Sequence, residues 1–217
     1  MCVAPDRNIW RRDRGLDPVL IERARTVSLD VFDTLIVREC GTPEAVFRRT
    51  AARAAAAGLF SSPDAAEWFP RVRADAQRAA ESAERARRFP FEISFEAIYD
   101  QLPESLGDRA AIAAIEWAEE RAAVRANPFL LSLLADLKER GVPAILMSDM
   151  YLAGARIAEL LAAAGIGPDR YEALIVSSDH GCRKSDGALF DRLSERHPET
   201  PPAAMLHIGH HPPGDQA

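Results

Sequence analysis

Four polar clusters in this chain carry side chains that could react together, and each cluster follows an apolar run. The clusters are Asp30, Asp33 and Thr34; Ser148 and Asp149; Ser177, Ser178 and Lys184; and Gly209, His210, His211 and Asp215. In an open α/β sheet, chemistry collects at the carboxyl ends of the strands. A carboxylate, a hydroxyl, a lone lysine and an acidic cluster that converge on one crevice suit a compact anion reacting at a carboxylate.

Lysine is rare in this chain, at Lys138 and Lys184 only, among 27 basic residues. A cation that is otherwise always arginine marks a position that needs a compact ammonium group rather than a planar fork. Lys138 lies in a pattern typical of a solvated helix, whereas Lys184 lies in a loop after an apolar run. Lys184 is therefore the more interesting of the two.

The elements that must position these clusters follow from the apolar runs, which predict strands at residues 27–32, 142–147, 172–176 and 203–208. Helical patterns lie at residues 16–25, 128–140, 153–164 and 186–196. Continuous apolar strands that alternate with helices indicate a parallel sheet covered on both faces. We therefore predict an α/β fold with a doubly wound parallel sheet.

One long helical stretch, rich in Ala, Arg and Glu, follows the first strand. Its apolar spacing and breaks predict helices at residues 43–57, 63–88, 94–102 and 106–125. By itself this stretch would suggest a simple bundle, but its position inside the α/β pattern indicates an inserted cap. We expect an α/β core formed by residues 1–41 and 127–217, and a helical cap formed by residues 42–126.

The bulk composition is that of an ordinary globular protein, with 217 residues, 47% hydrophobic and 28% charged. A net charge of −6 gives no basic footprint for nucleic acid. The three scattered cysteines do not resemble a disulfide framework, and no apolar stretch has the length of a membrane span. The N-terminus does not resemble a signal peptide. We expect a cytoplasmic protein that binds neither nucleic acid nor membranes.

With these residues in view, the chain resembles the haloacid dehalogenase-like (HAD) hydrolase superfamily. The matching segments are LDVFDTLIVR, ILMSDMYL, VSSDHGCRKSDGALFDRL and HIGHHPPGDQA. The first two segments are most similar to a bacterial subgroup with DVFDTL and SDMYL motifs, and the cap has the position of the first cap class. The resemblance covers nearly the whole chain and implies a Rossmann-like core.

The resemblance implies a role for each matching residue. Asp30 would be the nucleophile of an aspartyl intermediate, Thr34 would support its loop, and Ser148 would hydrogen-bond the transferring group. Lys184 would pair with Asp30 and with the anion. Magnesium would be held by Asp30, the backbone carbonyl of Phe32 and Asp215. The implied activity is magnesium-assisted hydrolysis of a phosphate monoester, and the expected partner is a small phosphorylated or anionic substrate.

The chain departs from the superfamily at the position two residues after the nucleophile, where most phosphatases carry an acid/base Asp. Here that residue is Phe32. Asp33 follows and should point elsewhere on an extended chain, although it could reach in from a loop. Asp149 is another candidate for support, or a helix cap. Because a halide leaves without a proton, Phe32 also fits a metal-independent dehalogenase-type hydrolase.

The last motif departs as well, because His210 stands where the superfamily has an Asp. Imidazole is a poor ligand for magnesium, so a catalytically impaired binding module with this fold is a further alternative. A transition-metal site formed by His207, His210, His211 and Asp215 is conceivable. We favour a partly buried His207 and a polar loop, because adjacent residues seldom ligate together.

Three charged residues near the expected site have two readings each. Arg38 could contact an anionic substrate group or lie in a solvated loop. Glu116 and Glu120 could line the cap side of the crevice, but we expect them on a solvent-exposed face beside Arg121 and Arg125.

Superfamily members usually continue with a helix and another strand after the last motif. We therefore expect a C-terminal partner domain or a homodimer to cover the sheet edge.

Overall fold

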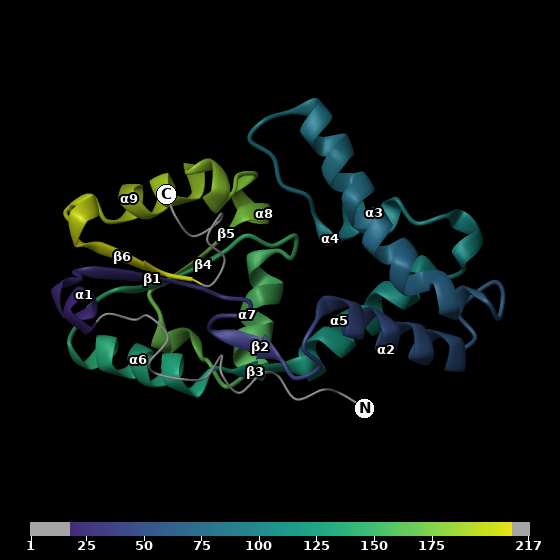
Figure 1. Cartoon of the computed structure of the whole chain (residues 1–217), viewed down its shortest axis with the longest axis horizontal. Helices are drawn as coiled ribbons and strands as arrows, with labels where there is room; N and C mark the ends of the chain where they lie inside the picture. The colour runs from purple at the N-terminus through teal and green to yellow at the C-terminus, as the bar shows by residue number, and fades with distance from the viewer. Residues whose placement is uncertain (1–17, 210–217) are drawn as a thin grey trace.

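The computed structural model describes residues 18–209, and its centre is a four-stranded parallel sheet (Figure 1). The strands are β1 (Thr26–Asp30), β4 (Ala144–Ser148), β5 (Ala173–Val176) and β6 (Met205–Ile208), in the order β5-β4-β1-β6. All neighbouring pairs are parallel. This arrangement confirms the predicted α/β class and places β1, which carries Asp30, between two other strands.

Alternate side chains of the strands are buried on opposite faces of the sheet. Leu146 belongs to the large core that includes Leu134 of α6 (Pro128–Glu139) and Leu160 of α7 (Gly154–Ala163). Its neighbour Ile145 packs on the other face with Leu189 of α9 (Ala188–Arg196). Helices therefore cover both faces, and this explains why β4 and β5 are almost continuously apolar and why even the polar residues of β1 are buried.

The cap consists of helices that lie beside the sheet, to the right in Figure 1. They are α2 (Pro43–Ala56), α3 (Ala65–Arg87), α4 (Phe95–Asp100) and α5 (Arg109–Ala123), with a short 3-10 turn η2 (Glu104–Leu106) before α5. All four predicted helices are present, each ending within a few residues of its expected bounds. Small alanine side chains, among them Ala51, Ala76 and Ala80, let the helices approach closely.

The two chain crossings between cap and core form a small sheet that the sequence pattern did not predict. Strand β2 (Ile36–Arg38) pairs antiparallel with β3 (Val124–Ala126). The side chain of Asn127 donates a hydrogen bond to the Thr34 carbonyl (3.1 Å) and caps α6. Three-residue strands are too short to show an alternating pattern in the sequence. Here their pairing holds the two connections between core and cap next to each other.

The first strand ends earlier than predicted. The expected strand 27–32 stops at Asp30, and Asp33 has a backbone φ of 55°, in the left-handed region. Aspartate tolerates this conformation better than most residues. The turn places Phe32 and Asp33 outside the strand.

The remaining helices are short connections. They are α1 (Pro18–Arg23), α8 (Ser177–His180), η3 (Pro168–Arg170), η4 (Lys184–Asp186) and η5 (Pro202–Ala204). Within residues 18–209, no helix combines the length and the apolar character needed to cross a membrane.

Candidate active site

The centre of the candidate site is the Asp30 carboxylate at the end of β1. The Lys184 ammonium lies 2.8 Å from Asp30 Oδ1, and the Thr34 hydroxyl donates a hydrogen bond of 2.9 Å to Oδ2. The Asp30 and Lys184 side chains are only 9% and 4% exposed. The turn after β1 brings Thr34 back onto Asp30, so residues four positions apart meet. An ion pair with so little solvent around it is strongly directional.

Lys184 reaches this position from a loop that two carboxylates hold in place. After α8, Gly181 adopts a left-handed conformation (φ 67°) and turns the chain toward the sheet. The Lys184 backbone N–H donates to Asp149 Oδ1 (2.8 Å), and the Arg183 N–H donates to Asp186 Oδ2 (3.1 Å). Burial raises the pKa of Asp149 to about 6. Through its hydrogen bond to the Lys184 N–H, Asp149 at the end of β4 fixes the loop of residues 181–186, which we call the lysine loop.

Ser148 is the last residue of β4 and is 1% exposed. Asp30 is in register with Met147, so Ser148 lies one residue beyond the level of Asp30 on the adjacent strand. Ser177 and Ser178, which follow β5, form hydrogen bonds with the loop that follows β4. The Met150 N–H donates to Ser177 Oγ (2.8 Å), and the Ser178 hydroxyl donates to the Leu152 carbonyl (2.8 Å). The three strand ends thus form one connected rim.

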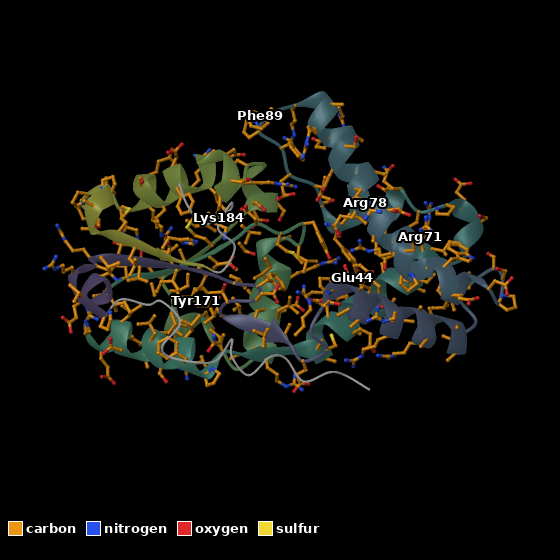
Figure 2. The ribbon with its side chains drawn as sticks, in the orientation of Figure 1. Glu44, Arg71, Arg78, Phe89, Tyr171 and Lys184 are labelled. Atoms are coloured by element: carbon orange, nitrogen blue, oxygen red, sulfur yellow. The ribbon has the colours of Figure 1, made fainter. Side chains whose placement is uncertain are left out.

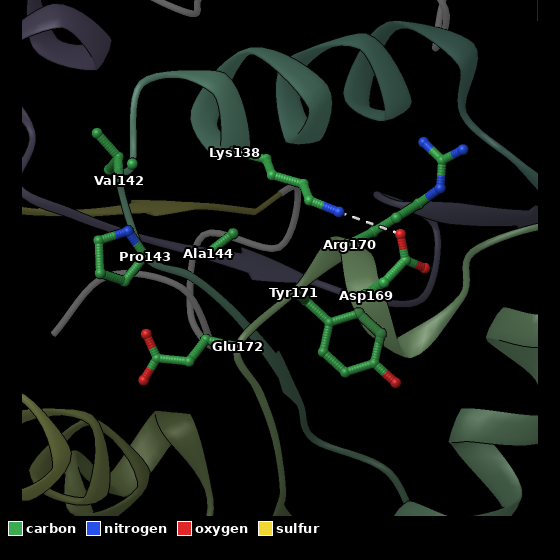
Figure 3. Close-up of a pocket in the computed structure, with 9 residues that line it drawn as sticks. Lys138, Val142, Pro143, Ala144, Asp169, Arg170, Tyr171 and Glu172 are labelled. Carbon is green, nitrogen blue, oxygen red and sulfur yellow. Dashed lines mark hydrogen bonds and ion pairs between the residues drawn. The ribbon is translucent and has the colours of Figure 1, made fainter.

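The two lysines differ in the way the sequence suggested. Lys138 lies in α6, with its side chain 58% exposed, and pairs with Asp169 at 3.1 Å. Lys138 and Asp169 line an open pocket of about 280 Å³ (Figure 3), beside Pro143 and Ala144 at the start of β4. This is the opposite end of the strand from Ser148. Lys184, in contrast, is 4% exposed, and Figure 2 shows it in the α/β part of the molecule, with the cap helix α3, which carries both Arg71 and Arg78, to its right.

Arg38 does not lie in a solvated loop, so the second of its two readings is wrong. It belongs to β2 and is 4% exposed. Its Nη2 and Nε atoms lie 2.7 and 2.8 Å from Glu120 Oε1 in the cap, and its guanidinium lies over the Phe32 ring at 4.8 Å. The position of the usual acid/base carboxylate is thus occupied by an aromatic ring under an arginine whose charge a glutamate balances. Contact of Arg38 with a substrate stays a prediction.

The expected solvent-exposed face of α5 is also wrong, because Glu116 and Glu120 are both buried. Arg73 of α3 donates to Glu116 through Nε (2.9 Å) and Nη2 (2.8 Å), and the Tyr99 hydroxyl donates to the same carboxylate (2.7 Å). The helical spacing of the two glutamates was visible in the sequence. Their partners come from β2 and α3, far away along the chain, and local spacing cannot identify such partners.

The metal ligands implied by the resemblance lie only partly in the described residues. Asp30 and the Phe32 carbonyl lie at the end of β1, whereas His210, His211 and Asp215 lie outside residues 18–209. Carboxylate and carbonyl oxygens are the donors that suit magnesium, so the described part of the set fits this ion in kind. Within the described range, no three His, Cys, Asp or Glu residues form a group that could hold a metal ion.

His207 lies in β6, where it is partly buried. Its Nδ1 is 2.8 Å from the Ser28 hydroxyl, and its ring packs edge-on against Phe190. This is the packing position that we favoured over a transition-metal ligand. Asp33 is half-buried in the turn after β1, so the chain has already turned where this carboxylate could reach in. Its acid/base role stays a prediction.

No protein-family model and no curated protein matches the sequence. Solved structures do match. The L-2-haloacid dehalogenase from Xanthobacter autotrophicus is 18% identical with a TM-score of 0.57, over 85% of this chain and 69% of that one. YfnB from Bacillus subtilis, a proposed HAD-hydrolase whose structure holds magnesium, gives 18% identity and a TM-score of 0.59, over 89% and 82%.

CbbY from Rhodobacter sphaeroides, in complex with phosphate, is 18% identical with a TM-score of 0.50, over 85% of this chain and 76% of that one. At such low identity, these likenesses establish the architecture alone. The chain has the HAD fold: a Rossmann-like core with a helical cap inserted after the first strand. The likeness does not separate the subgroup with DVFDTL and SDMYL motifs from other members.

Proposed function

We propose that this chain, which has the HAD fold, is a hydrolase that acts through an aspartyl intermediate and cleaves phosphate monoesters with the help of magnesium. The observation that carries the proposal is the Asp30 carboxylate at the end of β1, held between Lys184 Nζ (2.8 Å) and Thr34 Oγ1 (2.9 Å). A buried carboxylate with fixed orientation suits nucleophilic attack. The neighbouring Ser148 supports the choice of an anionic substrate.

The proposed reaction has two steps. An Asp30 carboxylate oxygen forms a bond to phosphorus, the bond from phosphorus to the ester oxygen breaks, and the leaving oxygen takes the electron pair and then a proton from water. Water next attacks the acyl phosphate, which releases inorganic phosphate and restores the carboxylate. In both steps Thr34 and Lys184 hold the carboxylate, and the lysine offsets the negative charge of the phosphoryl group.

Magnesium, when bound, would supply positive charge that balances the phosphoryl oxygens. Asp30 and the Phe32 carbonyl would hold it, together with Asp215 and, less suitably, His210. The cap would exclude water from the crevice and select the substrate. Its face toward the core includes Glu120, which pairs with Arg38 of β2, so the charge that the cap presents near Phe32 is balanced.

A second candidate is metal-independent hydrolysis of a carbon–halogen bond. Phe32 favours it, because a halide leaves without needing a proton from the position where phosphatases carry an acid. Several of the structurally similar proteins are haloacid dehalogenases, the one from Xanthobacter autotrophicus among them. In this reaction Asp30 would attack carbon, the carbon–halogen bond would break, and water would hydrolyse the resulting ester.

The deciding experiment is hydrolysis of an aryl phosphate with magnesium and with a chelator, by wild type and by Asp30→Asn. Magnesium-dependent turnover that disappears in Asp30→Asn supports the phosphatase. Halide release from a 2-haloacid that needs Asp30 but survives the chelator supports the dehalogenase instead. If neither reaction occurs, the proposal fails, and a non-catalytic module with this fold is left.

A further inference from the structure

We infer that Glu92, a residue of the cap, is a positioning residue for Lys184 and so links cap closure to assembly of the site. Glu92 lies in the segment between α3 and α4, yet its carboxylate contacts the core. The inference rests on the proposed function for the role of Lys184. It assigns to the cap a part in organising the nucleophile, beyond covering the crevice.

The contacts of the Glu92 carboxylate come from the chain segment that leads into Lys184. The Ser177 hydroxyl donates to Oε2 (2.7 Å), and Arg183 donates through Nη2 to Oε1 (2.7 Å) and through Nε to Oε2 (3.1 Å). The side chain is 4% exposed. A fork-to-carboxylate pair in such burial fixes direction as well as distance. Arg183 directly precedes Lys184 in the chain.

The surrounding cap segment reinforces the grip on Arg183. The guanidinium of Arg183 lies over the ring of Phe91 at 4.6 Å, and Glu81 of α3 lies 3.8 Å from it. Phe89, at the far end of this segment, is 77% exposed and stands at the tip of the cap in Figure 2. The chain therefore leaves α3 at an exposed tip and returns to place Phe91 and Glu92 on the core.

The other side of the lysine loop is held by the core itself, through the Lys184 N–H that donates to Asp149. The loop is thus clamped between a core carboxylate at residue 149 and a cap carboxylate at residue 92. If the cap moves away, Arg183 loses its carboxylate partner and only the contacts from the core remain. Lys184 Nζ then has a less defined position against Asp30, from which it is 2.8 Å away here.

Glu92→Gln tests this link, because it keeps the volume and replaces an acceptor oxygen by a donor that faces donors. The matched control is Glu96→Gln, which removes a cap-to-core ion pair with Arg156 whose glutamate side chain is 65% exposed and which lies away from the lysine loop. A second variant, Arg183→Lys, keeps the charge and loses the fork. Arg183→Lys still tests the inference if the Glu92→Gln protein fails to fold.

The chain contains a probe for the loop that does not depend on activity. Cys182 lies two residues before Lys184 and is 4% exposed, and Cys40, near the crossing to the cap, is 8% exposed. The labelling rate of each thiol, resolved by peptide mass, reports local opening. We expect Glu92→Gln to raise labelling of Cys182 about tenfold with Cys40 unchanged, Arg183→Lys to raise it less, and Glu96→Gln to match wild type.

In the aryl phosphate assay, the same series separates positioning from binding. We expect kcat of Glu92→Gln to fall about tenfold or more while KM changes less than about threefold, because Ser148 and the rest of the crevice are untouched. Unchanged Cys182 labelling in both loop variants overturns the inference. If Cys182 labelling changes in the variants but the wild-type protein hydrolyses no aryl phosphate, Glu92 still positions the lysine loop, and the proposed function is wrong.

Discussion

Removal of the Glu116 carboxylate should destabilise the cap strongly, because it leaves a buried arginine charge without a partner. Arg73 is 0% exposed, and its Nη1 has no hydrogen-bond partner in the described structure, so Glu116 supplies its ionic contact. Breaking a buried pair by removing one partner costs roughly 3–5 kcal/mol. Glu116→Gln keeps one acceptor oxygen, so we expect a loss of about 3 kcal/mol.

The assay is urea unfolding followed by circular dichroism, together with the thermal midpoint. For a chain of this size, 1 kcal/mol shifts Tm by roughly 2–4 °C, so Tm should fall by about 6–12 °C. The control is Glu195→Gln, which removes an exposed pair with Arg192 whose side chains are 62% and 48% exposed. Such pairs contribute roughly 0–1 kcal/mol.

The double replacement Arg73→Met with Glu116→Leu separates charge from packing. Well-packed apolar residues often replace a buried ion pair at little cost, so much of the stability lost in Glu116→Gln should return. The aromatic rings around Arg73, Phe47 at 4.7 Å and Tyr151 at 5.3 Å, can pack against methionine as well. A Glu116→Gln protein within 1 kcal/mol of wild type would refute the reasoning.

Three further predictions concern the site. Lys184→Met should abolish hydrolysis of an aryl phosphate. Lys138→Met, which removes an exposed ion pair, should leave kcat within about twofold of wild type and Tm within about 2 °C of wild type. Burial raises the pKa of Asp149 above its unfolded value to about 6, so its protonated form favours the fold. Stability should then fall as pH rises from about 4 to about 6, and Asp149→Asn should flatten this part of the unfolding profile; an unchanged slope in the variant would show that other groups titrate there. With Phe32 where an acid is usual, aryl phosphates should react much faster than alkyl phosphates, and Phe32→Asp should narrow that ratio; an unaltered ratio would mean that another residue supplies the proton.

The sequence predicts which edge of the sheet carries the polar residues, although β1 ends at Asp30, two residues before its predicted end. A parallel strand covered on both faces is mostly apolar, so a charged or hydroxyl side chain at its carboxyl end marks the rim of the sheet. This is why Asp30 and Ser148 could be placed at one edge from the order of the runs, whereas Lys184 was singled out by the rarity of lysine in the chain. The spacing of the helices was equally readable, because apolar residues recur at the helical period in α2, α3 and α5.

What the sequence does not reveal are the partners of buried charges. Arg73 and Glu116 are 43 residues apart, and Arg183 and Glu92 are 91 apart, so no local pattern joins them. A weak signal for Glu92 does exist. It is a lone carboxylate inside the apolar run Phe89 to Phe95, and a carboxylate buried in such a run needs a cation. The run shows that a partner is needed without showing which one.

Two ion pairs, each with a glutamate shielded from solvent, join the cap to segments that adjoin the Asp30 site. Arg38, beside Phe32, pairs with Glu120 of α5, and Arg183, beside Lys184, pairs with Glu92. One pair lies next to the crossing strands, and the other lies at the end of β5. Because both arginines belong to segments that contact or adjoin the carboxylate, a shift of the cap changes both walls of the site together. The position of the cap therefore affects the geometry around the Asp30 carboxylate, and a variant that loosens either pair should lower the rate of the reaction as well as the stability of the fold.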